Sequence, residues 1–498
     1  MAEYTARDSR FHYKDLGENL GISGNTNAAI EMASGDFVVL ADHDDMIPEQ
    51  ALFEVASAIN EHPGCDVIYS DEDKLDMDGG ALFDPHFKPD FNPDLLTSVN
   101  YICHLFVVKR TLLEQVGGFR NEYDGAQDYD FIFRCTEAAK EIYHIPRVLY
   151  HWRCHQDSTA SNPESKLYAF EAGARAIMAH YERCGIPAEA VEKGVDYGIY
   201  HTRFRIPGEP LVSVIIPNKD HAADLDLCIR SIIERATYKN LEFVVIENNS
   251  TESETFTYYE KLQKEFPQVR VVCWEREFNY SAINNFGAQF AEGEYLLFLN
   301  NDTEIVSPGL FEEMLGFCQR PEVGIVGARL LYQDDTIQHA GVVIGFGGIA
   351  GHTFIGLHEA ENSYFHRAMC AQDYSAVTAA CMMTKAEVFR QAGGFTEELA
   401  VAFNDIDYCM KVRALGKLVV YAPYAVMHHY ESKSRGLEDT PEKVARFNRE
   451  VAVFARRWPD ILKNGDPYYN PNLTLRKSNF ALRDLLKEKI GEPYKLEG

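Results

Sequence analysis

The chain has 498 residues, 46% of them hydrophobic and 12% aromatic, which is enough for the cores of two to four domains. The net charge of -28 argues against sequence-independent binding of nucleic acid. The 11 cysteines are scattered without a CxxC pair, which is typical of a reducing compartment. No run approaches the roughly 20 apolar residues of a transmembrane helix, and the N-terminus carries no signal-peptide core. We therefore expect a cytoplasmic protein with at most peripheral contact to the inner face of the plasma membrane.

The first part of the chain predicts a small α/β block. Asn27 is expected to open an alanine-rich helix, and the apolar run Phe37-Val-Val-Leu-Ala predicts a buried strand that ends in Asp42-His-Asp44-Asp45. The further expected elements are an amphipathic helix over 48–59, a strand over 66–70, an acidic loop over 71–76, a strand over 105–109, a turn at Gly117, a helix opened by Asp128, a strand before His151 and a helix over 167–184.

The second part predicts a larger block of the same kind. Strands over 212–217 and 241–247 alternate with helices, which is the signature of a parallel sheet. The unbroken apolar run over 295–299 predicts a strand buried on both faces, and Asn300, Asn301 and Asp302 follow it. The further expected elements are a flexible glycine-rich loop over 346–352, a turn at Gly393, a helix opened by Asp405, a strand before His429, and a helix followed by coil from Thr440.

The two blocks align as a duplication. Asn27 pairs with Asn285 and Asp44 with Asp302 at the same separation (285−27 = 302−44 = 258). Gly117 pairs with Gly393 at 276, Asp128 with Asp405 at 277 and His151 with His429 at 278, so the second block carries an insertion of 18 to 20 residues (276−258 to 278−258). About twenty residues precede the aligned motifs in the first block and about seventy do so in the second. We therefore expect the first copy to lack the opening strand–helix–strand half.

Each copy is expected to bring carboxylates, an asparagine and a histidine to one edge of a sheet, where ligands bind in open α/β folds. Hard cations such as Mg²⁺ and Mn²⁺ prefer carboxylate ligands, which imidazole supplements, and they commonly hold phosphates. An Asp at a helix start is more often only a cap, and a lone histidine more often only packs. Retention of the same pattern in both copies favours the functional interpretation.

The order Asp42-His-Asp44-Asp45, Gly117-Gly-Phe, Gln127-Asp128-Tyr-Asp and Tyr150-His151-Trp resembles family-two glycosyltransferases of the A-type (nucleotide-diphospho-sugar transferase) fold. The second copy resembles them through Ile216-Pro217-Asn-Lys, Asn300-Asn-Asp302, Gly393-Gly-Phe, Asn404-Asp405 and the run from His429 to Gly436. The tandem arrangement looks most like bacterial O-antigen, capsule or rhamnan-type enzymes. The resemblance implies two tandem Rossmann-like α/β domains, with mostly parallel sheets, flanking helices and a helical tail.

The resemblance also implies roles for particular residues. Asp302 and His429 in the second copy, and Asp42, Asp44 and His151 in the first, would hold Mg²⁺ or Mn²⁺ on the donor diphosphate. Asp405 and Asp128 would be the general bases that deprotonate the acceptor hydroxyl during inversion. The residues implied in donor binding are Pro217, Asn218, Asp220, Glu247, Asn249, Asn285, Asn301 and Asn27.

We accordingly predict a glycosyltransferase that moves a sugar, with rhamnose as one candidate, from a nucleotide-diphosphate donor to a glycan or lipid-linked acceptor. The alternative is an impaired homologue that serves as a carbohydrate-binding scaffold. A nucleotidyltransferase is disfavoured because the loop at Pro217 lacks glycines. The expected domains are a shortened first domain over 1–165, a helical linker over 166–210, a complete domain over 211–439 and a tail over 440–498. Pairing into a homo-oligomer is one way to cover the open sheet edge of the first copy.

Overall fold

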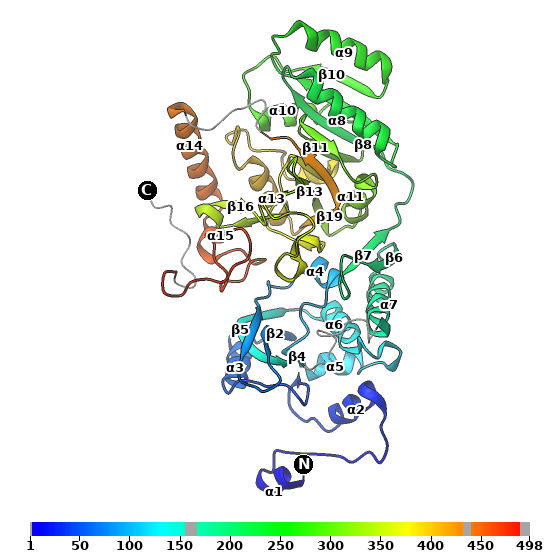
Figure 1. Ribbon diagram of the computed structural model, residues 1–498, viewed down its shortest axis with the longest axis vertical. Helices are drawn as coiled ribbons and strands as arrows, with labels where there is room; N and C mark the ends of the chain where they lie inside the picture. Colours follow the sequence, from blue (N-terminus) through cyan, green and yellow to red (C-terminus); the bar gives the residue numbers. More distant parts are fainter. Residues whose placement is uncertain (1, 155–166, 432–439, 489–498) are drawn as a thin grey trace. The chain divides into compact units, whose positions relative to one another are not determined.

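The computed structural model describes residues 2–154, 167–431 and 440–488, and the chain forms two compact units, Met1–Thr202 and Arg203–Gly498 (Figure 1). Both units are α/β. Most of the segment predicted as a helical linker, 166–210, falls in unit 1, which includes α7 (Leu167–Cys184). The small side chains of α7, such as Ala172 and Ala176, are buried, and His180 Nδ1 bonds Glu137 of α6 (Gln127–Ala138) at 2.7 Å.

Unit 2 is built on a mixed ten-stranded sheet in the order β10-β9-β8-β11-β18-β13-β19-β12, with β14 and β17 attached to its side. The first four strands run parallel, whereas β18 is antiparallel to both of its neighbours. Their bounds are β8 Val212–Asn218, β9 Leu241–Glu247, β10 Val269–Cys273, β11 Tyr295–Leu299, β12 Thr303–Ile305, β13 Val323–Leu331, β14 Ile337–His339, β17 Gln372–Asp373, β18 Cys381–Lys385 and β19 Leu418–His429. The sequence predicts β8, β9, β11 and β19, and it does not predict the other six.

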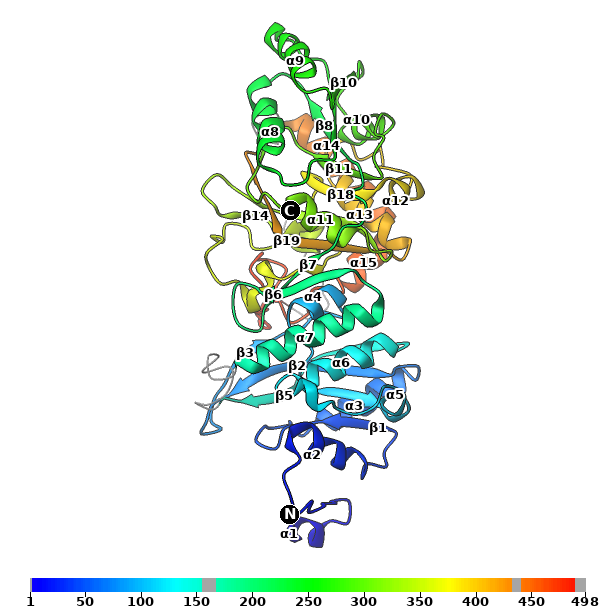
Figure 2. The same ribbon diagram turned by 90° about the vertical axis from the view of Figure 1, so that its right-hand side faces the viewer.

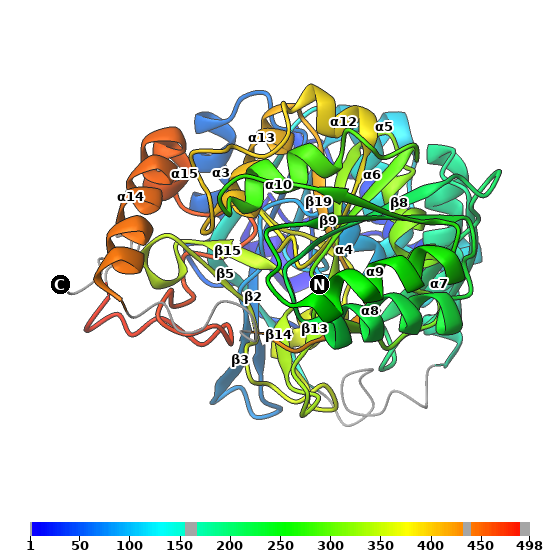
Figure 3. The same ribbon diagram turned by 90° about the horizontal axis from the view of Figure 1, so that it is seen from above.

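Helices cover both faces of this sheet. Figures 2 and 3 show α8 and α9 on one face, with α10, α12 and α13 on the other. The coverage explains the unbroken apolar sequence of β11, in which Leu297, Phe298 and Leu299 are fully buried. The helices of unit 2 are α8 Ala222–Arg235, α9 Ser253–Glu265, α10 Tyr280–Gly287, α11 Leu310–Cys318, α12 Ala386–Gln391, α13 Asn404–Ala414, α14 Pro441–Arg457 and α15 Pro459–Asn464.

The sheet of unit 1 repeats, strand for strand, the part of that sheet that begins at β11. Its β1, β4, β2, β5 and β3 pair with the same neighbours and in the same directions as β11, β18, β13, β19 and β14. The bounds are β1 Phe37–Leu40, β2 Val67–Leu75, β3 Leu82–His86, β4 Phe106–Lys109 and β5 Ile142–Arg153. Three of these four pairings are antiparallel, so the expectation of a mostly parallel sheet fails here. The reason is that three of the four parallel pairings in unit 2 involve β8, β9 or β10, and these strands have no counterpart among the described residues of unit 1.

Helix α3 of unit 1 exposes apolar side chains that are buried at the matching positions of α11 in unit 2. Leu52 and Phe53 in α3 are 64% and 70% exposed, whereas Leu310 and Phe311 at the matching positions of α11 are 1% and 0% exposed. In unit 2 the Tyr238 ring, which follows α8, stacks on Phe311 at 6.4 Å. The helices of unit 1 other than α6 and α7 are α1 Ala2–Arg7, α2 Gly21–Ile30, α3 Ala51–Glu61, α4 Pro93–Ser98 and α5 Arg110–Val116, and strands β6 Ala188–Lys193 and β7 Tyr200–Phe204 follow α7.

The acidic segment from Asp71 to Leu75 is not the predicted loop, because it continues β2 into the interior. Each carboxylate has a cationic or imidazole partner from a distant part of the unit. Asp71 Oδ1 lies 2.8 Å from His144 Nε2, Glu72 Oε2 lies 3.2 Å from Lys88 Nζ, and Asp73 lies 2.5 Å from His151. A buried charge is tolerated when it is paired and hydrogen-bonded in this way.

The segment over 346–352 is folded, in contrast to the predicted flexible loop. Strands β15 (Val342–Ile344) and β16 (Ala350–His352) form a hairpin around it. The tail after α15 packs on this region, with the Tyr469 ring 5.0 Å from Phe346 and the Phe480 ring stacked 4.7 Å from Phe354. The tail is therefore part of the core of unit 2.

Candidate active site

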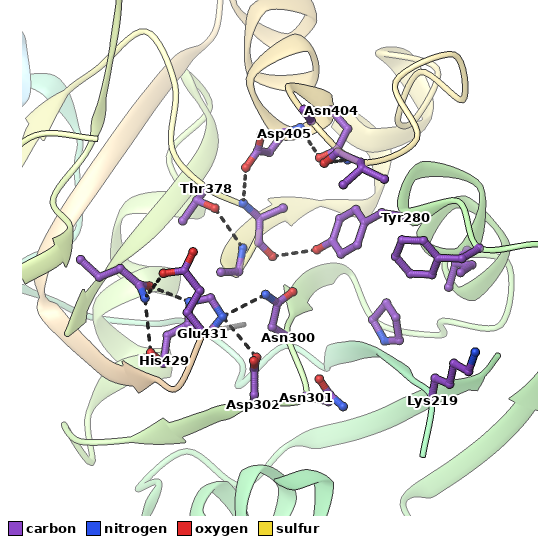
Figure 4. Close-up of a pocket in the computed structure, with 18 of the residues that line it drawn as sticks. Lys219, Tyr280, Asn300, Asn301, Asp302, Thr378, Asn404, Asp405, His429 and Glu431 are labelled. Carbon is purple, nitrogen blue, oxygen red and sulfur yellow. Dashed lines mark hydrogen bonds and ion pairs between the residues drawn. The ribbon is translucent and has the colours of Figure 1, made fainter. Parts of the chain in front are cut away.

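A cavity of about 740 Å³ opens at the carboxyl ends of β8, β11 and β19 in unit 2 (Figure 4). Strand ends supply one side and the start of α13 supplies another, so residues far apart in the sequence face the same space. Its lining includes eight residues singled out below: Asn218, Lys219, Asn301, Asp302, Asp405, His429, Arg446 and Phe447. The predicted ligand edge of the sheet is therefore the wall of a cavity.

His429 and Asp302 meet in this cavity as an oriented pair. His429 Nε2 lies 3.2 Å from Asp302 Oδ1 and 3.1 Å from Asn300 Nδ2, and both members of the pair are 8% exposed. The Gln338 amide orients the ring, since its Nε2 donates to the His429 carbonyl and to Glu431, which leaves its Oε1 to accept from His429 Nδ1 at 2.6 Å. With Nδ1 held by Gln338, Nε2 is the ring nitrogen that faces the cavity, where the Asn300 amide and the Asp302 carboxylate both lie beside it.

Asp405 stands on a different wall of the cavity, at the start of α13. Its Oδ2 accepts a hydrogen bond from Ala379 N at 3.2 Å, and its Oδ1 accepts from Ile406 N at 2.9 Å. The preceding Asn404 side chain is buried and donates to the Val401 carbonyl at 3.0 Å. The carboxylate is thus fixed at a helix N-terminus and half-buried, in a position to face a bound molecule.

The residues predicted to bind the donor separate into two groups. Pro217, Asn218 and Asn301 line the cavity, and Asn301 Nδ2 donates to Asn218 Oδ1 at 2.6 Å, which ties the ends of β11 and β8 together. Outside the cavity lining, Asp220 and Asn249 lie on adjoining loops and Glu247 ends β9. All three bond to backbone or hydroxyl groups.

Asp220 is an example of this second group. Its Oδ1 accepts from the backbone N–H groups of Thr251 and Glu252 at 2.8 and 2.9 Å. Partial burial acts to raise the pKa of Asp220, but these bonds outweigh it and hold the pKa below its ordinary value. The observed contacts therefore hold a loop next to the cavity.

Asn27 and Asn285, which the resemblance implies in donor binding, each bond through the side-chain amide to the backbone of a distant segment. Neither opens a helix, since each lies inside one. Asn285 accepts from Phe395 N at 2.8 Å and donates to Phe395 O at 2.9 Å, and Asn27 makes the same two bonds to Phe119. A Cβ at Gly394 would come within 2.6 Å of the Asn285 amide oxygen, so this bond pair also explains the glycine.

The predicted metal residues of unit 1 are not assembled like their counterparts in unit 2. His151 Nδ1 bonds Asp73 at 2.5 Å, and Asp44 is exposed. Asp42 instead lies with Asp45 and His104, where potential ligand atoms are within 4.8 Å of one another. Burial raises the pKa of Asp42, an effect that the nearby His104 opposes. Sequence alignment could not have found His104, because the matching position in the second copy is Ala380 (104+276).

Asp128 retains part of the environment of Asp405. Its Oδ2 accepts from Asn100 Nδ2 at 3.0 Å and lies 3.7 Å from Cys103 Sγ. Cys103 corresponds to Ala379 (103+276), whose N–H holds Asp405. The two carboxylates thus keep matched places at a helix start, while the groups around them differ.

Several lining residues had no signal in the sequence. Gln338 and Glu431 orient His429, and Arg446 and Phe447 come from α14. Glu431 is the exception, since it lies in the run from His429 to Gly436 that carries the resemblance, although the sequence assigned it no role. The predicted run to Gly436 extends over residues 432–436, which lie outside the described residues.

A mixed sheet whose strand ends carry a carboxylate–histidine pair, with a second carboxylate across the cavity, agrees with the A-type glycosyltransferase fold that the sequence resembles. The model of the family described as glycosyl transferase family 2 matches residues 1–117 and 213–390, and the chain belongs to this family. In the part of the chain that the structure describes, no helix combines the length and apolarity needed to cross a bilayer.

Two curated relatives match along 97% of the chain. Uncharacterized protein y4gI of Sinorhizobium fredii is 45% identical over 53% of its own length, and O-antigen biosynthesis protein RfbC of Myxococcus xanthus is 39% identical over 37% of its length. The chain thus spans about half or less of these relatives.

Two solved structures overlap in part. A mannosyltransferase from Pyrobaculum calidifontis, solved with GDP-Man and Mn²⁺, is 17% identical at a TM-score of 0.38, with 50% of this chain and 64% of that one covered. GalNAc-T7, solved with UDP, GalNAc and Mn²⁺, is 15% identical at a TM-score of 0.43, with 55% and 53% covered.

Proposed function

We propose that unit 2 transfers a sugar, with inversion, from a nucleotide-diphosphate donor to a glycan or lipid-linked acceptor in the synthesis of a bacterial surface polysaccharide. The observation that carries the proposal is the placing of the Asp302–His429 pair and Asp405 on different walls of one cavity. The named function of the Myxococcus relative supports polysaccharide synthesis as the setting. The reaction would take place at the inner face of the plasma membrane.

Asp302 and His429 are the residues that would hold a divalent cation, Mg²⁺ or Mn²⁺. The donor set fits, because an imidazole nitrogen and a carboxylate oxygen lie 3.2 Å apart and Gln338 holds the ring from its other nitrogen. A bound cation would neutralise negative charge on the departing diphosphate. Lys219 lines the same cavity and supplies a further positive charge from the end of β8.

Asp405 would act as the general base. The acceptor hydroxyl oxygen forms a bond to the anomeric carbon, the bond from that carbon to the diphosphate oxygen breaks, and the hydroxyl proton passes to Asp405. Attack from the side opposite the leaving group inverts the anomeric centre. The bond from Ala379 N holds Oδ2 in place, so the carboxylate does not have to reorganise before it accepts the proton.

Unit 1 would not catalyse transfer, and would serve instead as an impaired, carbohydrate-positioning copy. The specific support is that His151 is engaged by Asp73 and that Asp42 and Asp45 are grouped with His104. Rhamnose remains one candidate for the transferred sugar.

The test is transfer and donor hydrolysis across a panel of nucleotide sugars, with Mn²⁺ or with EDTA, for wild type, Asp302→Ala, Asp44→Ala and Asp405→Asn. We expect Asp302→Ala to lose metal-dependent donor binding and Asp44→Ala to keep it. Asp405→Asn should lose transfer and retain donor binding. Full activity in Asp405→Asn would refute the assigned base, and absence of metal-dependent binding to every donor would refute the function.

A further inference from the structure

Helix α14 touches the turn that precedes Asp405 at several points. Glu450, which is 3% exposed, accepts hydrogen bonds from Val401 N at 3.1 Å and Ala402 N at 2.9 Å, one on each carboxylate oxygen. Val401 and Ala402 also line the cavity. A carboxylate that receives two backbone N–H bonds out of water is a strong and directional contact. Glu450 therefore fixes the backbone three to four residues before the proposed base.

The turn held in this way has a backbone that needs support. Phe403 has a φ of 61°, in the left-handed region that a bulky residue rarely adopts. Its ring packs on two aromatic rings of α14, with its centroid 5.4 Å from that of Phe447 and 5.7 Å from that of Phe454. Conformations of this kind persist only where surrounding contacts hold them, and they often occur at active sites.

The far end of α14 holds the first turn of α13 as well. Arg457 Nε and Trp458 Nε1 both donate to Asp407 Oδ1, at 2.6 and 2.9 Å, and Asp407 is fully buried. Asp407 lies two residues after Asp405. The contacts of α14 thus bracket the base, with Glu450 on the turn before it and Arg457 on the helix after it.

The first copy provides an internal comparison. Helix α7 follows β5 as α14 follows β19, and Arg183 of α7 lies 4.0 Å from Asp130, the counterpart of Asp407. Seven residues before each arginine stand Glu450 (457−7) and Ala176 (183−7), and Ala176 is a buried alanine. The carboxylate clamp is therefore present in the copy with the assembled cavity, and an alanine takes its place in the other.

We propose that Glu450 is a positioning residue, which holds the turn Val401–Asn404 so that Asp405 faces the acceptor. The inference rests on the proposed function, because it assigns Asp405 a task. Glu450 itself does not contact the reacting atoms. Its removal should therefore reduce the rate of transfer and leave the nucleotide end of the cavity, at Asn218 and Asp302, unchanged.

The test is Glu450→Gln, which keeps the shape of the side chain but leaves only one oxygen acceptor for two N–H groups. We expect kcat for transfer to fall at least tenfold, with donor KM and Mn²⁺-dependent donor binding within twofold of wild type. Hydrogen exchange at the Val401 and Ala402 amides should accelerate at least tenfold. Glu442→Gln, the same chemical change at an exposed position of α14, should alter none of these quantities.

A second variant keeps the inference testable if Glu450→Gln folds poorly. Trp458→Phe removes one of the bonds to Asp407 and should lower kcat by a few-fold with donor KM unchanged. Unchanged exchange and unchanged kcat in a folded Glu450→Gln protein would overturn the positioning role. Equal losses of donor binding and transfer would also overturn it. A wild-type protein that transfers no sugar refutes the proposed function instead, and the exchange of the two amides is then still a separate readout.

Discussion

His429 Nε2 lies 3.2 Å from Asp302 Oδ1, and the orientation that brings them together depends on Gln338, which accepts from the opposite ring nitrogen. A histidine held at one nitrogen by an acceptor presents a fixed lone pair at the other. The cation affinity of the cavity should consequently depend on a residue that does not touch the cation.

Replacing that acceptor tests the relationship. Gln338→Leu should weaken Mn²⁺ binding in the presence of nucleoside diphosphate by about 10- to 100-fold, because the ring is free to rotate or change tautomer. Titration calorimetry measures the effect. Gln391→Leu on the exposed side of α12 is the control, and equal Mn²⁺ affinity in both variants would contradict the role of Gln338.

Asn285 should behave as a structural residue. Asn285→Ala leaves the N–H and carbonyl of Phe395 without their partner, and should lower the free energy of unfolding by about 1–3 kcal/mol. Donor affinity of the folded protein should remain close to wild type. Asn301→Ala should show the opposite balance, with weaker donor binding and a smaller loss of stability. Urea unfolding and donor titration, performed on both variants, separate the two cases.

The buried His339 predicts that unit 2 loses stability in acid. Burial, together with the nearby His352 and His429, holds the pKa of His339 well below its ordinary value, so the ring is neutral in the folded state. The unfolded chain takes up this proton as the pH falls through about 6.5, and the stability of the folded state then decreases by up to about 1.4 kcal/mol per pH unit.

Urea unfolding between pH 7 and pH 5 measures this dependence. His339→Gln retains an acceptor for the Thr378 N–H, which lies 3.5 Å from Nε2, but removes the titration, and should flatten the curve. His358→Gln, at an exposed site, should leave the slope as in wild type. A slope unaltered by His339→Gln would assign the acid sensitivity to other groups.

The C-terminal tail should contribute strongly to the stability of unit 2. Phe480 is 1% exposed and packs on Phe354 and Tyr469, so Phe480→Ala should cost about 3–5 kcal/mol of unfolding free energy. Leu486, which is 98% exposed in the same tail, gives the matched control, and Leu486→Ala should be neutral. Equal unfolding curves for the two variants would show that the tail packs weakly.

The sequence alone was enough for the features that follow from local pattern. The apolar run of β11 predicts a strand covered on both faces, and the structure buries it in this way. The separation of 258 residues that Asp44–Asp302 shares with Asn27–Asn285 predicts a repeat, and the matching strand pairings of the two sheets show it. Features set by distant partners could not be foreseen. Asp71 to Asp73 read as a loop because His144, Lys88 and His151, which make their burial tolerable, are far away in the chain.

The same limit applies inside the candidate site. Nothing in the residue type distinguishes Asn285, whose amide bonds Phe395 away from the cavity, from Asn301, which lines the cavity and bonds Asn218. Glu450 had no motif around it and no counterpart in the first copy, so only the packing of α14 revealed its bonds to Val401 and Ala402.

The exposed pair Leu52 and Phe53 has a consequence for how this protein behaves in concentrated solution. The apolar side chains at the matching positions of unit 2 are buried, whereas Leu52 and Phe53 form an exposed apolar surface to which other molecules can bind. Self-association should rise with protein concentration and with sulfate, and a dye that fluoresces in apolar surroundings should bind there. Phe53→Lys should suppress both effects without altering the unfolding midpoint, and would yield a better-behaved sample for every experiment above.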